Sequence, residues 1–223
     1  MASLRALFNS PAAHAAIVQL APWASSGASY NLQVAELRAA QLSAGEDSAA
    51  GMSVITAVDL GDPFGPIGSI HPRRKQPVGQ RLGAAVLSHV YSTPRPYAGP
   101  RLAGAAAGGG AAGGGLSATL TFQGAPPLQL LQPSPVGPFA NSSVCPTGVS
   151  PTLCSGFQLQ GGSGVWYPAV GSLAAGGQAL VLQAAGAVNE TAVAATASGW
   201  SLWPITLLYS NGLPAFPWNA TVG

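Results

Sequence analysis

The residues with the clearest capacity for chemistry are one histidine and two acids. Asp59 and Asp62 precede His71, and the stretch that begins at Gly61, GDPFGPIGSIHP, is rich in glycine and proline, which interrupt regular structure. A serine hydrolase needs an imidazole within hydrogen-bond reach of a hydroxyl, and a carboxylate that fixes the imidazole tautomer. His71 is therefore a candidate general base, and either acid is a candidate partner. The alternative is a solvent-facing or structural histidine, which is the commoner role of a single histidine in a loop.

The attacking hydroxyl is harder to place. The sequence contains no Gly-x-Ser-x-Gly block, in which a strand and a helix present a nucleophilic serine. Ser3 and Ser10 lie too close to the first residue to follow a strand. The other histidines, His14 and His89, are far in sequence from clustered cysteines or carboxylates. No metal site is therefore predicted, and no cofactor is expected.

The elements on both sides of this loop are predicted to hold it at the end of a strand. Residues 52–60 carry a β-branched run short enough to form a buried strand. After the loop, apolar residues over 78–90 recur with the 3.6-residue period of a helix. This order places His71 beyond the carboxyl end of a strand, where open α/β sheets bind ligands.

Residues 1–92 are predicted to form one α/β unit. Residues 15–20 indicate a second buried strand, and residues 31–42 indicate a helix with Val34 and Leu37 inward and Arg38 outward. Alternating helices and strands favour a parallel sheet covered by helices. Two strands are too few for such a sheet, so further strands are expected outside this sequence.

The composition changes after this unit. Residues 93–115 are rich in proline, glycine and alanine and are expected to be a linker and a mobile loop. Residues 116–223 contain short alternating runs separated by proline and glycine clusters. This spacing predicts a small antiparallel β domain.

Charge and hydropathy exclude two classes of partner. Only 6% of the residues are charged, against about a quarter in ordinary globular proteins. The formal net charge of +2 gives no electrostatic footprint for nucleic acid. No window offers the run of about 18 strongly apolar residues that a membrane span requires.

The cysteines and the glycosylation sequons indicate the cellular compartment in which the protein resides. Cys145 and Cys154 enclose a short segment and are predicted to form a disulfide, the alternative being two free thiols in a cytosolic protein. Glycosylation sequons occur at Asn141, Asn189 and Asn219. Together these features favour the secretory route, with an extracellular, lysosomal or vacuolar destination. The first residues, MASLRALFNSP, lack the apolar core of a signal peptide, so the true start is expected upstream.

Residues 52–100 closely resemble the histidine-bearing block of the sialate O-acetylesterases, which belong to the SGNH-type carbohydrate esterases. The resemblance rests on AVDLGDPFGPIGSIHPRRKQPVGQRLGAAVLSHVY and the later YAGP. Similar segments follow the family's order: IVQLAPW, AELRAAQ, VWYPA and WSLWPITLLYSNGLPAFPW. The resemblance implies a partial three-layer flavodoxin-like sheet followed by a small antiparallel β domain. It also implies removal of acetyl groups from sialic acid hydroxyls, with His71 as the base.

The same resemblance places the nucleophilic serine in an N-terminal half before the first residue, so that half is an expected partner of this chain. Many bacterial members of the family carry an aspartate two residues before the histidine, where this chain has Ser69. The catalytic acid is therefore Asp62, Asp59 or no side chain at all. Two rival hypotheses are an esterase acting on acetylated polysaccharide and a non-catalytic remnant or glycan-binding module.

Overall fold

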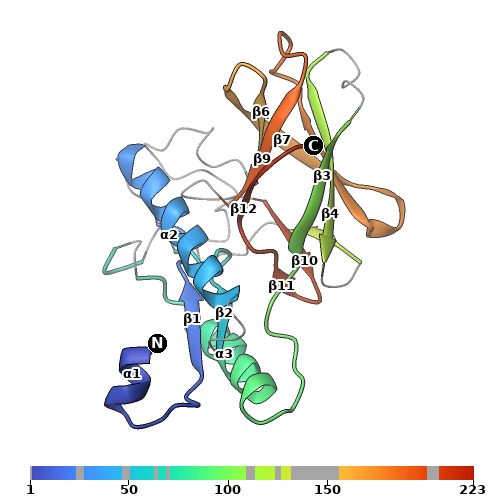
Figure 1. Cartoon of the computed structure of the whole chain (residues 1–223). Coiled ribbons are helices and arrows are strands. Elements are labelled where there is room, and N and C mark those ends of the chain that lie inside the picture. Colours follow the sequence, from blue (N-terminus) through green and yellow to red (C-terminus); the bar gives the residue numbers. More distant parts are fainter. Residues whose placement is uncertain are drawn as a thin grey trace.

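The computed structural model describes residues 2–23, 28–46, 51–62, 65–68, 71–108, 114–123, 127–131, 156–199 and 206–223. Figure 1 shows the helices gathered around the first two strands and the remaining strands gathered in the C-terminal part. Within these residues, no helix has both the length and the apolar character needed to cross a membrane.

The N-terminal part is built on two parallel strands. β1 (Ala15–Gln19) pairs with β2 (Met52–Thr56) in parallel. A short helix, α1 (Ala2–Leu7), precedes them, and two longer helices, α2 (Ala28–Glu46) and α3 (Gln76–His89), contact both strands. The two strands and two helices expected over residues 15–90 are thus confirmed as elements.

The C-terminal part is a seven-stranded antiparallel sheet beside a three-stranded one. The larger sheet contains β3 (Arg101–Ala107), β4 (Leu116–Gln123), β6 (Phe157–Gly161), β7 (Trp166–Leu173), β8 (Ala179–Ala184), β9 (Val193–Ser198) and β12 (Trp218–Thr221). Its spatial order is β12-β9-β6-β7-β8-β4-β3. The smaller sheet joins β5 (Gln129–Leu131), β10 (Leu207–Ser210) and β11 (Leu213–Pro214).

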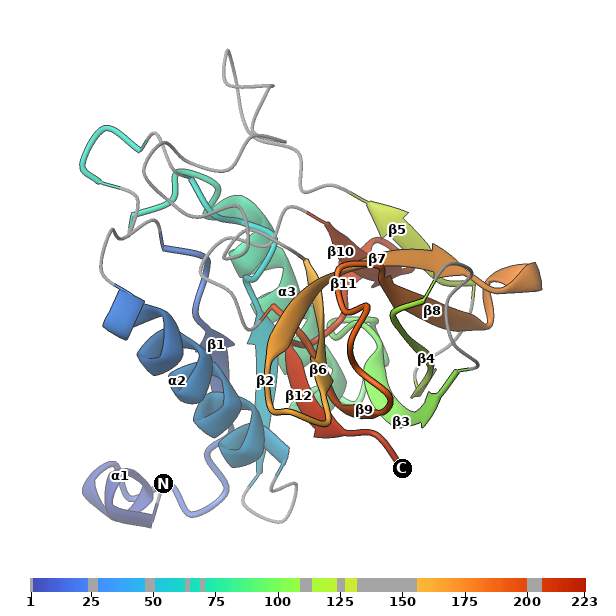
Figure 2. The same ribbon diagram turned by 90° about the horizontal axis from the view of Figure 1, so that it is seen from above.

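The larger sheet curves until its two ends nearly meet. β12 and β3, which are its outermost strands, contact each other. The Gly223 backbone N–H also donates a hydrogen bond to the Ala105 carbonyl oxygen in β3, at 3.3 Å. Figure 2 shows the strands turning around a shared interior.

That interior is the main hydrophobic core. Alternate residues point inward, as in β6, where Phe157 and Leu159 are buried and Gln158 between them is partly exposed. Leu120 and Leu180 are fully buried in the same cluster. The Trp218 ring lies against the Phe157 ring with centroids 6.0 Å apart. Burial of each such side chain stabilises the fold by about 1.5–3 kcal/mol.

The predicted fold class is wrong. The chain does not form a three-layer flavodoxin-like sheet followed by a small β domain, because its dominant unit is the nearly closed antiparallel sheet. The parallel pairing is limited to β1 and β2 in the described residues. The fold class was predicted from the clear helical periodicity of the N-terminal part, although that part is the smaller one. The antiparallel pairings link strands far apart in sequence, such as β4 with β8, and a local pattern does not reveal them.

The glycine- and alanine-rich segment also differs from expectation. Residues 101–107, expected to be linker and loop, form β3 and pair with β4. The pairing register shifts between Leu102 and Gly104, as it does where a strand contains a β-bulge. The division into units at residues 92 and 115 stays a prediction.

The buried face of α2 contains a cation. Arg38 is fully buried, and its guanidinium donates hydrogen bonds to the carbonyl oxygens of Leu20, at 2.9 Å, and Gly199, at 2.8 Å. Burial lowers the pKa of Arg38 to about 10. Leu37 is instead 48% exposed, so the inward and outward assignments of these two residues were wrong. Arg38 joins the helix to the end of β1 and to the residue after β9.

Candidate functional site at the end of β2

The loop that carries His71 is a series of tight backbone turns. The N–H of Gly65 donates to the Asp62 carbonyl, that of Gly68 to the Gly65 carbonyl, and that of His71 to the Gly68 carbonyl, at 2.9–3.2 Å. A Cβ at Gly65 would lie 2.8 Å from the Gly68 oxygen, and Gly68 has a φ of +96°. Both positions favour glycine. The turns leave His71 exposed.

Asp62 closes this loop. Its Oδ2 accepts hydrogen bonds from the Arg73 backbone N–H, at 3.2 Å, and from Arg73 Nε, at 2.5 Å, while Oδ1 accepts from Nη2 at 2.9 Å. The Asp62 side chain is 9% exposed and that of Arg73 is 39% exposed. Because the pair spans His71 in sequence, it fixes both ends of the segment that carries the imidazole.

Asp59 is held by a second and more deeply buried arginine. Arg81 Nη1 and Nη2 each donate to one oxygen of Asp59 at 2.7 Å, and Nη1 also donates to the Thr56 carbonyl at 2.7 Å. The two side chains are 9% and 7% exposed. This two-point pairing ties α3 to the carboxyl end of β2.

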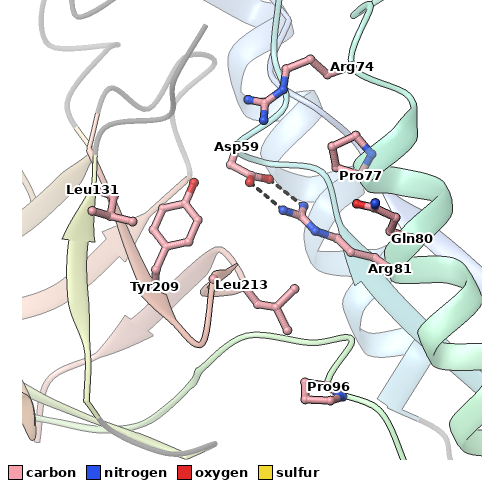
Figure 3. Close-up of a pocket in the computed structure, with 10 residues that line it drawn as sticks. Asp59, Arg74, Pro77, Gln80, Arg81, Pro96, Leu131, Tyr209 and Leu213 are labelled. Carbon is pink, nitrogen blue, oxygen red and sulfur yellow. Dashed lines mark hydrogen bonds and ion pairs between the residues drawn. The ribbon is translucent and has the colours of Figure 1, made fainter. Parts of the chain in front are cut away.

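A tyrosine from the smaller sheet completes this cluster. Tyr209 of β10 is buried, and its hydroxyl points toward Asp59 (Figure 3). Burial, the negative charge of Asp59 and a hydrogen bond with Asp59 raise the pKa of Tyr209 above its ordinary value of 10.0. The phenol is therefore neutral at physiological pH, and it links the C-terminal part to the end of β2.

A pocket of about 420 Å³ opens beside the buried pair. Besides Asp59, Arg81 and Tyr209, its walls contain Arg74, Pro77, Gln80, Pro96, Leu131, Gly212 and Leu213. Figure 3 shows that α3 and its preceding turn supply one side and that β5, β10 and Leu213 supply the other. The pocket offers a carboxylate, two guanidinium groups, an amide and a phenol next to apolar surface, a mixture suited to a polyhydroxylated ligand.

The structure pairs both predicted acids with arginines, Asp59 with Arg81 and Asp62 with Arg73. Among the described residues, the partners shown for Asp59 are Arg81 and Tyr209, and the partner shown for Asp62 is Arg73. The catalytic roles of His71, Asp59 and Asp62 stay predictions. Ser69, Cys145, Cys154 and Asn141 lie outside the described residues. Asn189 and Asn219 are exposed.

Sequence reasoning missed Arg81 and Tyr209. Arg81 lies among the apolar residues of α3, three positions after Val78 and four before Ala85, so it shares their face of the helix. A charged residue on such an apolar face indicates that a buried group of opposite charge lies beside it. Tyr209 offered no comparable signal, because its proximity to Asp59 depends on how the two parts pack together.

The other two histidines lie together near the amino ends of β1 and β2. The His14 and His89 rings stack with centroids 4.9 Å apart. His14 Nε2 hydrogen-bonds the Ser53 hydroxyl at 3.0 Å, and His89 Nε2 hydrogen-bonds the Tyr97 hydroxyl at 2.7 Å. Burial and the nearby His89 and Arg5 lower the pKa of His14 below its ordinary value of 6.5. The described residues contain no group of three or more His, Cys, Asp or Glu able to hold a metal ion.

The lowered pKa of His14 predicts that the folded protein becomes less stable in acid. Below pH 6.5 the unfolded chain binds a proton at His14 more readily than the folded chain, so unfolding is favoured as the pH falls. We expect the urea midpoint to fall between pH 7.5 and pH 5.5, and to fall less in His14→Asn. Urea titrations followed by tryptophan fluorescence measure both slopes. Equal slopes in the two proteins would contradict the assignment.

Comparison with known proteins shows what fold this arrangement belongs to. The chain is similar to the crystal structure of XAC1771, described as a novel carbohydrate acetylesterase from Xanthomonas citri, with a TM-score of 0.67 and 23% sequence identity. The match covers 98% of this chain and 43% of that chain, so this chain spans less than half the length of its structural relative. No protein-family model and no curated protein matches the chain.

The likeness extends over both parts of the molecule. Because 98% of this chain is covered, the parallel strand pair, its helices and the nearly closed sheet occur together in one solved chain. The two parts are therefore a known combination.

Proposed function

We propose that this protein is a carbohydrate O-acetylesterase that uses a serine and a histidine to hydrolyse acetyl esters on sugars. The observation that carries the proposal is the structural likeness to a carbohydrate acetylesterase over 98% of the chain. Support comes from the exposed His71, which lies in a loop closed by Asp62 and Arg73 at the end of β2. The pocket beside Asp59 and Arg81, with its mixed polar and apolar walls, would receive the sugar.

In the proposed reaction, His71 moves the protons. It accepts the proton of a serine hydroxyl as the serine oxygen attacks the acetyl carbonyl, and then gives that proton to the departing sugar oxygen. In the second half, His71 takes a proton from water as the water oxygen attacks the acetyl-serine ester. Acetate leaves and the serine hydroxyl recovers its proton. The proposal takes this serine from a segment outside these 223 residues.

Of the two acids, we assign the role of orienting His71 to Asp62. It belongs to the same loop, and its carboxylate already bonds the backbone N–H of Arg73, two residues after the histidine. Asp59 is engaged by two nitrogens of Arg81 and by Tyr209, which suits a structural role.

For the substrate we propose O-acetylated sialic acid, following the resemblance of residues 52–100 to the sialate O-acetylesterases. An esterase for acetylated polysaccharide and a glycan-binding module without activity are the competing functions. Acetate release should be measured with the protein in the full form that its gene encodes, on O-acetylated sialic acids and on acetylated xylan. We expect kcat/KM to be at least about tenfold higher for sialic acid esters, a difference of about 1.4 kcal/mol.

Each competing function predicts a different result in that experiment. A preference for xylan would assign the enzyme to polysaccharide esters. Sugar binding by calorimetry without acetate release from either substrate would instead favour the glycan-binding module and overturn the esterase proposal.

We also propose a location on the secretory route. Support comes from Asn189 and Asn219, which are both exposed and therefore accessible to glycosylation. Thiol labelling of the native protein with and without reductant tests the predicted Cys145–Cys154 disulfide. Complete labelling without reductant would count against this location.

A further inference from the structure

A second groove lies between α2 and the strands β3 and β12 of the larger sheet. It has a volume of about 300 Å³, which is at the small end of ligand-binding pockets. Ala39 and Leu42 of α2 form one wall, and Leu102 of β3 and Trp218 of β12 contribute to the other. None of the residues assigned to the proposed reaction lines this groove.

Asn219 lies at the wall of this groove. It is exposed on β12, next to the buried Trp218, because successive residues of a strand point to opposite faces of the sheet. Asn219, Ala220 and Thr221 form the acceptor sequence for asparagine-linked glycosylation. A sugar attached to Asn219 would therefore start at the groove itself.

The groove has the chemistry to hold the sugar that would be attached there. Leu42 and Leu102 are partly exposed, and with Ala39 they offer an apolar surface to the apolar face of a sugar ring. Arg101 also lines the groove, with its guanidinium 4.7 Å from the centre of the Phe216 ring. A guanidinium donates hydrogen bonds and has no acceptor, which suits sugar hydroxyl and acetamide oxygens.

We propose that the groove binds the first N-acetylhexosamine of an asparagine-linked glycan on Asn219, and that this sugar fastens α2 to the sheet. The inference goes beyond the proposed esterase activity and does not depend on it, but it rests on the proposed secretory route, where asparagine-linked glycans are attached. The attachment removes most of the entropic cost of binding, because the sugar is already held at the groove. The sugar would cover apolar surface contributed by both parts of the molecule.

Asn189 provides a matched control. It is also exposed and also begins a sequon, Asn189-Glu190-Thr191. It lies in the turn between β8 and β9, and its neighbour Glu190 is bonded to the Ser163 hydroxyl and to the Tyr167 hydroxyl. A glycan on Asn189 would thus extend from a turn of the sheet, at a different place from the groove between α2 and β12.

The test uses the protein secreted from eukaryotic cells with high-mannose glycans, in a variant that keeps Asn219 as its sole sequon (Asn141→Gln, Asn189→Gln). Mass spectrometry first measures occupancy of Asn219. Thermal unfolding is then measured for the intact glycoprotein, for protein trimmed by an endoglycosidase that leaves one sugar, and for protein from which a peptide N-glycosidase has removed every sugar.

We expect the trimmed protein to keep the Tm of the intact glycoprotein, and complete removal to lower the Tm by about 2–4 °C. Asn219→Gln should lower the Tm of the fully glycosylated protein by a similar amount, whereas Asn189→Gln should leave it unchanged. Both enzymes are applied to the secreted, folded protein, and mass spectrometry checks that each digestion is complete, so the comparison holds even where Asn219→Gln is poorly secreted. An unmodified Asn219, equal Tm values after trimming and after complete removal, or equal effects of the two Asn→Gln changes would each overturn the proposal.

Discussion

Replacing His71 with glutamine should lower kcat/KM for acetate release by about 10²- to 10⁴-fold, the usual contribution of a general base. Glutamine keeps a polar side chain of comparable length but cannot carry a proton between serine, sugar and water. The effect should appear in kcat, because His71 acts on the reacting atoms. Steady-state release of acetate from an O-acetylated sugar by the full-length enzyme measures it.

Stability and a second histidine provide the controls for this result. His71 is exposed, so His71→Gln should leave the thermal unfolding of the protein unchanged. His89→Gln removes an imidazole from the other end of the strand pair, beside His14 and Tyr97, and should retain wild-type kcat/KM. A His71→Gln enzyme with wild-type activity would remove the base assignment.

Replacing Arg81 with alanine should destabilise the protein by about 3–5 kcal/mol, as expected when one partner of a buried ion pair is removed. The change would leave the carboxylate of Asp59, which is 7% exposed, without its guanidinium. The Thr56 carbonyl would also lose a hydrogen bond from Nη1. Urea unfolding followed by circular dichroism measures the change in the free energy of unfolding.

The Asp62–Arg73 pair is a matched control, since it joins the same residue types in the same region. Arg73 is 39% exposed and its ion pair is screened by solvent, so Arg73→Ala should change the stability far less than Arg81→Ala does. Combining Arg81→Ala with Asp59→Asn should cost less than the sum of the two single changes, because the second removes the unpaired charge. A small effect of Arg81→Ala, equal to that of Arg73→Ala, would show that the Asp59–Arg81 pair contributes little to the fold.

The sequence predicted local elements well and their assembly poorly. The strands around Val18 and Val54 and the helix after Pro77 follow from short-range periodicity, and all of them are present. The pairing of β6 with β9, or of β12 with β9, joins strands that have two other strands between them in the sequence, so no local pattern indicates it. The dominant sheet was therefore underestimated.

In the candidate site too, the sequence predicts the local features but not the contacts that depend on packing. The loop between Asp62 and His71 was recognisable from its glycines and from the residue types that serine hydrolases use. The guanidinium partners of the two acids were not, because hydropathy assigns arginine to the surface. Arg38 and Arg81 are buried because each reaches hydrogen-bond acceptors at the ends of strands, and only the packed structure brings those acceptors within range.

The near closure of the seven-stranded sheet has a consequence for self-association. Edge strands with unpaired backbone groups recruit other chains, and proteins commonly block them with charged side chains. This chain has few charges to use, at 6% of its residues, and one acidic residue after Arg101. Contact between β12 and β3, together with the Gly223 hydrogen bond to Ala105, occupies the edges instead. Separation of β12 from β3 would expose the unpaired backbone groups of two edge strands at once, so intermolecular strand pairing should start there.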